Sequence, residues 1–398
     1  MTVTSDRTET TEDLTSGLKV HDVDAHVLEP ADLWTSRMST KWGDDVPHIQ
    51  RVDERDMWYI GDLRLGMAIG GQAQAGWHSP YPDAPWRYEE AHPAAWQSDA
   101  RLAWMDENGI YSQVLYPNTI AFNTARLLTV DAQLRLEIFQ AYNDFLSDFC
   151  SADPNRLIAL ANLPWWDLDQ SVAELERCQE LGHKGLNFGW QFEKTGLPPL
   201  RSSYWDPVLK RAEEMGWSVN FHTAFNETFV EDEGLVANAM QMTSIDLTKT
   251  SAEAFLANAR CISELILGGI CERYPTLKFV SVESGVGYIP FLLDSLDWQW
   301  TSLTTHLEHP DKLLPSEYFK RQIYATFWFD PHVSLAAELY PDNLMFETDF
   351  PHSTSLYPTP NTLAKGPRET INNHLRDLPY DVTKKLLQDT AAAVYSIT

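Results

Sequence analysis

The 398-residue sequence has little positive charge and no long apolar run. It contains 30 Lys and Arg against 57 Asp and Glu, which gives a formal net charge of −27. Such a chain repels phosphate backbones and anionic lipid surfaces, and no local basic patch offsets the repulsion. No run approaches the ~18 apolar residues of a membrane span. We therefore expect neither nucleic acid nor a membrane as a partner.

Cysteine is also scarce, with only Cys150, Cys178, Cys261 and Cys271, and no two of them form a CxxC pair. This spacing argues against a disulfide framework or a Cys-rich zinc site, and it fits a reducing compartment. Residues 1–17 are polar and Thr-rich and lack the apolar stretch of a signal peptide. We expect a cytoplasmic protein with a disordered tail over residues 1–17.

Eight short β-branched apolar runs alternate with amphipathic helical patterns, as in parallel strands joined by crossover helices. The runs begin at Leu18, Ser112, Leu157, Lys184, Ser218, Lys278, Gln322 and Leu344. The helical patterns cover residues 98–108, 131–151, 169–181, 204–215, 252–272, 286–300, 332–339 and 380–395. This alternation predicts an α/β fold, a (β/α)8 TIM barrel that forms a single domain over residues 18–398.

Three segments are too long for a plain βα repeat, which needs roughly 30 residues. They are residues 31–97, 226–250 and 353–370, and each follows a predicted strand. All three are therefore βα loops at the C-terminal face of the barrel, where we expect them to form a lid and a pocket wall. The many aromatic residues of segment 31–97 either line that pocket or pack the insertion onto the barrel.

Metal-capable side chains stand at the ends of four predicted strands. Asp24 and His26 end the first strand, and because side chains alternate along a strand, both point into the barrel mouth. His222, Glu283 and Asp349 end the fifth, sixth and eighth strands. Each alone is more often a cap or a satisfied polar residue. Three carboxylates buried together without cations would be costly, so the five residues predict a metal site.

The charges of this group favour two ions. Two divalent ions with one bridging hydroxide would neutralise Asp24, Glu283 and Asp349, whereas one ion would leave a negative charge. Asp24 and His26 would hold the first ion and His222 and Glu283 the second, with Asp349 binding metal and acting as general base. Imidazole and carboxylate ligands suit iron, zinc or manganese, and we favour iron.

Four residues near this group have other expected roles. We expect His352 to be catalytic, by shuttling protons or orienting Asp349, although a structural hydrogen bond is the alternative. Glu29 caps or orients the first strand rather than binding metal, and His183 lies at the surface. Ser284 is disfavoured as a nucleophile because the surrounding sequence lacks GxSxG.

Four phrases of the sequence resemble the amidohydrolase superfamily, in particular its amidohydrolase-related, aminocarboxymuconate-semialdehyde decarboxylase-like group. They are HDVDAHVLEP, WDPVLKRAEEMGWSVNFH, ICERYPTLKFVSVESGVGYIP and LMFETDFPH, and the likeness covers about residues 18–395. The resemblance implies a metal-dependent (β/α)8 enzyme with Asp24, His26, His222 and Asp349 at the metal.

The sequence departs from the decarboxylases of that group in two places. They usually carry His-x-His or Glu-x-His on the first strand and a proton-handling His on the sixth, whereas this chain has Asp24-x-His26 and Glu283. In this respect it is similar to nonheme diiron acyl-CoA thioester hydrolases of diterpenoid biosynthesis.

We therefore expect a dinuclear hydrolase, a homodimer, that cleaves a bulky acyl-CoA thioester to the free carboxylic acid with metal-bound hydroxide. The alternative is a nonoxidative decarboxylase of an aromatic or enoic acid. A non-catalytic binding barrel is the remaining alternative, and it would gain nothing from buried carboxylates. In each enzymatic case the partner is a small-molecule thioester or carboxylic acid.

Overall fold

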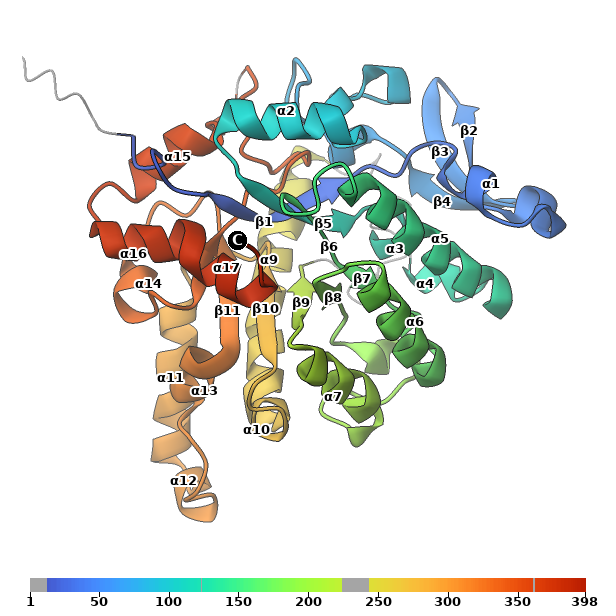
Figure 1. Cartoon of the computed structure of the whole chain (residues 1–398). Helices are drawn as coiled ribbons and strands as arrows, with labels where there is room; N and C mark the ends of the chain where they lie inside the picture. Colours follow the sequence, from blue (N-terminus) through green and yellow to red (C-terminus); the bar gives the residue numbers. More distant parts are fainter. Residues whose placement is uncertain (1–12, 123, 224–242, 361) are drawn as a thin grey trace, which may run out of the picture.

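The structure is a computed structural model that describes residues 13–122, 124–223, 243–360 and 362–398. Its central feature is a ring of parallel strands in sequence order, surrounded by helices (Figure 1). One sheet contains β1 (His21–Val27), β5 (Ser112–Pro117) and β6 (Leu157–Ala159). The other contains β7 (Ala161–Asn162), β8 (Gly185–Asn187), β9 (Ser218–His222), β10 (Lys278–Val282), β11 (Ile323–Phe327) and β12 (Leu344–Phe346).

All eight predicted runs contain strands, and the third holds both β6 and β7, which are separated at Leu160. The predicted (β/α)8 TIM-barrel class is confirmed, although regular strand pairing does not continue around the whole ring. Within each of these two sheets, every strand pairs in parallel with its neighbours. The strand ends that carry the candidate ligands therefore lie on one face.

Each predicted helical pattern overlaps at least one helix. These helices are α2 (Ser98–Asn108), α5 (Ala132–Cys150), α6 (Leu168–Glu180), α7 (Asp206–Met215), α9 (Ser244–Leu267), α10 (Ile270–Arg273), α11 (Ile289–Ser302), α14 (Val333–Leu339), α16 (Tyr380–Lys384) and α17 (Thr390–Tyr395). The patterns did not predict α1 (Leu33–Arg37), α3 (Thr119–Phe122), α4 (Thr124–Leu127), α12 (Thr305–Glu308), α13 (Pro315–Gln322) and α15 (Pro367–His374).

Local side-chain chemistry sets several helix ends. Asp131 accepts hydrogen bonds from the second and third backbone N–H groups of α5, which fixes its start. A capping box of Thr243 and Asp246 starts α9, so this helix begins before the predicted Ala252. Gly269, with a φ of 74°, separates α9 from α10 where one continuous helix is predicted.

The ring is completed between β1 and the end of β12 by a short seam instead of a regular ladder. Ala25 and Phe350 form a single parallel bridge. The Asp349 N–H donates to the Asp24 carbonyl at 2.9 Å, and the His26 N–H donates to the Phe350 carbonyl at 2.7 Å. This seam places Asp349 beside Asp24 and His26.

A buried carboxylate supports the same seam. Asp22 accepts hydrogen bonds from the Thr348 backbone N–H at 2.8 Å and from its hydroxyl at 2.6 Å. The Gln113 amide donates at 2.8 Å to the same Asp22 oxygen, Oδ2, that accepts from the Thr348 hydroxyl, and Arg101 in turn donates to the Gln113 Oε1 atom at 3.0 Å. Burial raises the pKa of Asp22 to about 7.

The interior of the ring is apolar and is closed by the end of the chain. Residues of β1, β5, β10 and β12 such as Val23, Val114 and Met345 form one cluster with α17. The Tyr395 hydroxyl on α17 donates to the Asn220 side chain at 2.7 Å. Asn220 precedes His222 by one inward-facing position on β9, so α17 covers the end of the barrel opposite the candidate ligands.

The insertion of residues 31–97 contains an antiparallel sheet that the sequence did not reveal: β2 (His48–Val52), β3 (Arg55–Ile60) and β4 (Leu63–Met67). Its β2 segment mixes polar and apolar residues without a clear alternation. Trp58 of β3 is fully buried and packs edge-on against Trp34, with ring centroids 4.8 Å apart, and the Trp34 Nε1–H donates to the Ile138 carbonyl on α5 at 3.0 Å. Some of the aromatic residues therefore pack the insertion onto the barrel, which was one of the two expectations.

Two other predictions need correction. Residues 13–17 do not continue a disordered tail, because the Leu14 N–H and the Asp13 carboxylate both bond to the Asn372 side chain on α15 at 2.9 Å. His183 is not at the surface but is 2% exposed, with its Nε2 2.9 Å from the Ser147 hydroxyl on α5. Residues 1–12 and the part of the 226–250 insertion up to 242 lie outside the described residues.

All four cysteines are buried free thiols. Among the described residues, none of the helices combines the length and the apolar character needed to cross a bilayer.

Candidate metal centre

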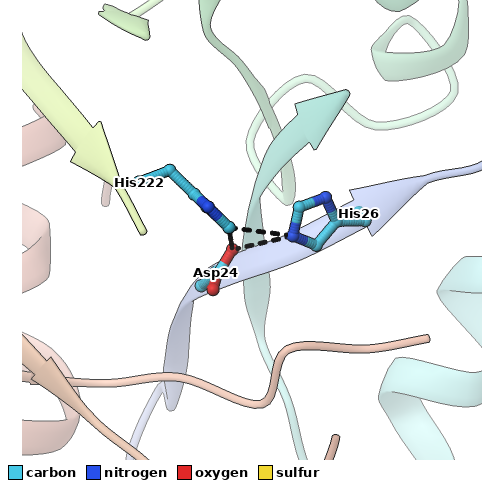
Figure 2. A group of neighbouring side chains, drawn as sticks. All are labelled: Asp24, His26 and His222. Carbon is cyan, nitrogen blue, oxygen red and sulfur yellow. Dashed lines mark hydrogen bonds and ion pairs between the residues drawn. The ribbon is translucent and has the colours of Figure 1, made fainter. Parts of the chain in front are cut away.

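Two strands bring an Asp and two His side chains together at the carboxyl face. Figure 2 shows Asp24 and His26 of β1 and His222 of β9 pointing toward one another. The Nε2 atoms of His26 and His222 are 3.0 Å apart. The Asp24 Oδ1 atom lies 3.6 Å from the His26 Nε2 atom and 3.5 Å from the His222 Nε2 atom. All three side chains are buried.

Backbone carbonyls determine which ring nitrogens carry hydrogen. The His222 Nδ1 atom lies 2.6 Å from the Thr223 carbonyl, and the His26 Nδ1 atom lies 3.2 Å from the Pro117 carbonyl. A carbonyl only accepts, so both Nδ1 atoms donate and both Nε2 atoms present lone pairs. Burial lowers the pKa of His222 to about 4 and the pKa of His26 well below its usual value, which keeps both rings neutral.

This arrangement fits a bound cation. Two imidazole lone pairs and the Asp24 carboxylate face one another, and both Asp24 oxygens are buried without a hydrogen bond in the described part of the chain. Lone pairs at 3.0 Å repel unless a positive centre lies between them. Histidine rings oriented by backbone carbonyls through Nδ1 are the usual arrangement of metal ligands.

Two more carboxylates complete the group. The Glu283 Oε2 atom lies 3.5 Å from the His222 Nε2 atom, and the Asp349 Oδ1 atom lies 3.6 Å from the His26 Nε2 atom. Glu283 and Asp349 both have left-handed backbone conformations, with φ values of 50° and 56°. Such conformations are strained for residues other than glycine and cluster at functional sites.

The acidic character of the group agrees with a need for positive charge. Burial, followed by the neighbouring charge of Asp349, raises the pKa values of Asp24 and Glu283 well above their usual values. The carboxylates can therefore be jointly ionised only if a cation compensates them.

The potential ligands form three overlapping sets, within each of which one ligand atom per residue lies within 4.8 Å of the others. The sets are Asp24–His26–His222, His26–Asp349–His352 and Asp24–Glu283–Asp349. The structure thus brings together all five residues that the sequence assigned to the metal, and His352 joins them. Because the sets share members, they form one centre.

His352 lies between two acceptors. Its Nε2 atom is 2.6 Å from the Asn118 Oδ1 atom, and the Asn118 amide nitrogen donates to the Val27 carbonyl, which fixes the direction of this amide. Its Nδ1 atom is 2.9 Å from the Asp349 Oδ1 atom. Both ring nitrogens can therefore carry a proton, and the ring also stacks on His26 at 3.7 Å.

Glu29 is placed away from the metal ligands. Its carboxylate accepts hydrogen bonds from the backbone N–H groups of Asn118 and Thr119, at 3.0 and 2.8 Å, and from the Thr119 hydroxyl at 2.9 Å. These contacts cap the start of α3, whereas the sequence had suggested that Glu29 caps or orients the first strand. Burial raises the pKa of Glu29 to about 7. By holding the loop after β5, Glu29 also positions the Asn118 side chain that bonds to His352.

The sequence reasoning missed two residues of the centre. Glu347 is fully buried and accepts a hydrogen bond from the Glu283 N–H at 3.2 Å. It stands two residues before Asp349, so strand alternation could have identified it. The Thr354 hydroxyl donates to the Asp349 carboxylate and lies 3.4 Å from the Glu283 Oε1 atom. Thr354 belongs to an irregular loop, where the sequence gives no signal.

Ser284 does not form a nucleophilic pair with a histidine among its hydrogen bonds. Its hydroxyl lies 2.8 Å from the Ser281 hydroxyl and 3.3 Å from the Tyr288 hydroxyl. This agrees with the expectation that Ser284 is not a catalytic serine.

A cavity of about 220 Å³ reaches the metal centre. One wall comes from the insertion and includes Gln74 and Tyr81, and the other comes from the loop after β12 and includes His352, Thr354 and Tyr357. His352 and Thr354 both contact the Asp349 carboxylate, so the cavity is separated from this candidate ligand by one layer of side chains. Among the described residues that line it, none is Lys or Arg.

A parallel (β/α)8 barrel whose strand ends gather buried imidazoles and carboxylates defines a metal-dependent barrel enzyme. The chain matches the family described as Amidohydrolase over residues 22–397 and belongs to that family. The superfamily resemblance noted in the sequence is thereby confirmed.

Named relatives and solved structures agree with this assignment. The chain is 26% identical over 266 residues to gamma-resorcylate decarboxylase from Rhizobium sp. (strain MTP-10005). This alignment covers 64% of this chain and 76% of the relative. A solved amidohydrolase from Mycobacterium avium subsp. paratuberculosis K-10 aligns with a TM-score of 0.71 and 20% identity, covering 95% of this chain and 99% of that one. A manganese-bound 5-carboxyvanillate decarboxylase from Novosphingobium aromaticivorans DSM 12444 aligns with a TM-score of 0.62 and 18% identity. The alignment covers 97% of this chain and 99% of that one. The two structural similarities support the fold.

Proposed function

We propose that this protein is a metal-dependent, nonoxidative decarboxylase of a small aromatic or enoic carboxylic acid. The observation that carries the proposal is the cavity of about 220 Å³ that ends at His352, beside Asp349, and has no Lys or Arg side chain in its described lining. Within that lining, a substrate carboxylate can contact His352 and neutral hydroxyl groups such as that of Thr354. The similarity to gamma-resorcylate decarboxylase supports the same chemistry.

The cavity argues against the bulky acyl-CoA thioester that we expected from the sequence. Pockets for drug-sized ligands begin at about 300 Å³, and this cavity is smaller. Coenzyme A also carries several phosphate charges, which a site without Lys or Arg on a chain with a net charge of −27 does not attract.

We propose that Asp24, His26, His222 and Asp349 hold the divalent ion. A bound divalent ion supplies positive charge that polarises and orients substrate oxygens. Iron and zinc remain candidates, and manganese gains support because the similar 5-carboxyvanillate decarboxylase is described with bound manganese.

His352 is the proposed source of the proton. In decarboxylation the bond between the carboxyl carbon and its neighbour breaks, carbon dioxide leaves, and the electron pair left on the neighbouring carbon takes a proton. The His352 Nδ1 atom faces Asp349 at 2.9 Å and the ring lines the cavity, so a proton held there can reach bound substrate. Asp349 then orients the ring instead of serving as the base of a hydrolysis.

Hydrolysis at a dinuclear centre is the second candidate, and Glu283 is the observation that favours it. Asp24, Glu283 and Asp349 form one ligand set, and Asp24, His26 and His222 form another, so two ions could share Asp24. Two adjacent ions would suit the attack of water on an acyl group.

One experiment separates the two candidates. Purified protein is assayed for iron, zinc and manganese content and then incubated with a panel of aromatic and enoic acids and short acyl thioesters. Carbon dioxide release with about one ion per chain supports decarboxylation. Thiol release with about two ions per chain would overturn it in favour of hydrolysis.

We also propose that the chain forms a homodimer through the outer face of α11 and α12. Four large apolar side chains there are more than half exposed: Phe291, Trp298, Leu303 and Leu307. Together they present on the order of 500 Å² of apolar surface, a large share of the ~800 Å² that each partner buries in a standard interface. A cytoplasmic location is proposed from the four free buried thiols.

A further inference from the structure

Asp330 is a buried carboxylate, beside the loop that carries Glu283, which the proposed chemistry does not use. It lies in the loop after β11 and is 7% exposed. Its Oδ1 atom accepts a hydrogen bond from the Val286 backbone N–H at 2.9 Å, and its Oδ2 atom accepts one from the Trp328 backbone N–H at 3.4 Å. The first of these bonds joins the loop after β11 to the loop after β10, which begins with Glu283.

The turn after β10 has a left-handed backbone conformation at two positions. Glu283 and Gly285 have φ values of 50° and 67°. This conformation is costly for a residue such as Glu283, so it persists only where neighbouring groups hold the turn. Gly285 also lies against Asp330, because a Cβ atom at this position would come within 2.9 Å of the Asp330 Oδ1 atom. The backbone therefore passes so close to Asp330 that the position requires glycine.

Hydrogen bonds hold this turn at both of its ends. At the start, the Glu283 N–H donates to the Thr326 hydroxyl at 3.1 Å. At the end, the Val286 N–H donates to the Asp330 carboxylate. Between these two anchors the Glu283 side chain is directed at the metal centre, where its Oε2 atom lies 3.5 Å from the His222 Nε2 atom. Loss of the Asp330 anchor would release one end of the turn, and the direction of the Glu283 side chain would no longer be fixed.

We infer that Asp330 is a positioning residue of the metal centre, which keeps the Glu283 carboxylate in place as a further metal ligand by holding the turn after β10. The inference rests on the proposed function, from which it takes the bound divalent ion but not the decarboxylation. Glu283 fits this role because its carboxylate forms a potential ligand set with Asp24 and Asp349. Groups that orient a ligand through hydrogen bonds affect metal affinity although they do not contact the ion.

The test measures the affinity for Mn²⁺ in the absence of substrate. The full-length protein is loaded with Mn²⁺, and the dissociation constant is determined by competition with a chelator. Asp330→Ala removes the acceptor of the Val286 N–H, so we expect the dissociation constant to rise roughly 10–100-fold. Asp330→Asn keeps one acceptor oxygen and should restore part of the affinity. An unchanged dissociation constant in Asp330→Ala would overturn the inference.

A double substitution separates the positioning of Glu283 from a general effect on the fold. Glu283→Gln keeps the size of the side chain but removes its charge, and it should weaken Mn²⁺ binding by itself. If Asp330 acts through Glu283, adding Asp330→Ala to Glu283→Gln should weaken binding little further, because both changes remove the same interaction. Equal effects of Asp330→Ala in the two backgrounds, or wild-type affinity in Glu283→Gln, would contradict the assigned role.

Asn343→Ala is the matched control, because the buried Asn343 also holds backbone groups but lies immediately before β12, at the end of the barrel opposite the metal centre. Its side-chain amide donates to the carbonyls of Phe319, Lys320 and Ile323 at 3.1, 3.2 and 2.9 Å. This variant should unfold at a lower urea concentration than the wild-type protein but keep the wild-type dissociation constant. A loss of Mn²⁺ affinity equal to that of Asp330→Ala would mean that any loosened loop impairs the centre, and the specific role of Asp330 would be lost.

Gly285→Ala decides the matter even if Asp330→Ala fails to fold. The added methyl group would displace the Asp330 carboxylate, so Mn²⁺ binding should weaken although Asp330 is retained, and wild-type affinity in this variant would count against the inference. Carbon dioxide release is scored separately. Mn²⁺ binding that depends on Glu283 and Asp330 without carbon dioxide release would keep the role of Asp330 and remove decarboxylation. A wild-type protein that binds no Mn²⁺ would overturn both.

Discussion

At the scale of single residues, orientation matters more than residue type. Asp24, His26 and His222 could each satisfy its hydrogen bonds locally, but the Thr223 and Pro117 carbonyls hold both rings so that their Nε2 atoms face Asp24. Because of this orientation, the two imidazole lone pairs and the Asp24 carboxylate face one another, and a bound cation would stabilise them.

Replacement of His222 tests this set. His222→Ala removes one of the two facing imidazoles, and we expect the metal content of the purified protein to fall from the wild-type value to near zero, as measured by elemental analysis. His332→Ala is the control, because His332 is an exposed histidine. Full metal occupancy in His222→Ala would contradict the assignment.

His352→Gln separates proton transfer from metal binding. Glutamine can still donate to Asn118 but cannot deliver a proton, so the turnover number should fall by about 10²–10⁴-fold. Metal content and circular dichroism should match the wild-type protein. A parallel loss of metal would instead make His352 a ligand, as the His26–Asp349–His352 set allows.

The burial of His183 predicts a pH dependence of stability. Burial lowers its pKa from 6.5 to about 4, so between these values the unfolded chain binds a proton that the folded chain does not. The contribution of neutral His183 to the free energy of unfolding is thus complete above pH 6.5 and decreases as the pH falls toward 4.

Urea unfolding of the wild-type protein and of His183→Gln between pH 4 and 8 measures this effect. The difference between the two free energies of unfolding should change below pH 6.5 and stay constant above it. A difference that is independent of pH would show that His183 is exposed in the folded state.

At the scale of the elements, the seam between β1 and β12 connects the fold to the site. The Ala25–Phe350 bridge and two backbone hydrogen bonds join β1 to the segment after β12. The Asp22 carboxylate adds bonds to Thr348 across the seam and is itself held by Gln113. The same few residues set the distance between Asp24 and Asp349. A change in the seam should therefore affect stability and metal affinity together.

Asp22→Ala tests the seam. It leaves the buried Thr348 and Gln113 donors without an acceptor, so we expect the free energy of unfolding to fall by about 2–4 kcal/mol. Metal affinity should weaken in the same variant, measured by competition with a chelator. Thr348→Val, which removes only the hydroxyl donor, should cost about 1 kcal/mol. Unchanged metal affinity in Asp22→Ala would separate the seam from the centre.

At the scale of the whole molecule, the exposed apolar face of α11 and α12 stands out on a chain with many acidic residues. Monomeric proteins rarely expose large contiguous apolar patches. Phe291 and Trp298 are seven residues apart on α11 and therefore lie on the same side of the helix, with Trp298 69% exposed.

Trp298→Asp should convert a dimer into a monomer, as seen by light scattering coupled to size-exclusion chromatography. Leu363→Asp is the control, since Leu363 is 97% exposed but lies in the loop after β12, away from α11. A wild-type protein that elutes as a monomer, or a Trp298→Asp variant that remains a dimer, would remove the proposed interface.

The sequence by itself predicted the barrel and the five candidate metal ligands that the structure brings together. Alternation of apolar runs and amphipathic helices is a local property, and it located the eight strands. Strand alternation likewise placed Asp24 and His26 on one side of β1. These features follow from backbone geometry within a few residues. They can therefore be predicted without knowing which segments pack together in the folded chain.

Only the tertiary structure decided the contents of the site and its access. The sheet of the insertion, the burial of His183, and the role of Thr354 depend on contacts between segments far apart in the chain. The cavity between Gln74 and His352 exists because two backbone bonds join the insertion to the loop after β12. Irregular loops have no periodic pattern, so their packing, and with it the size of the substrate, is set by long-range contacts that no local signal records.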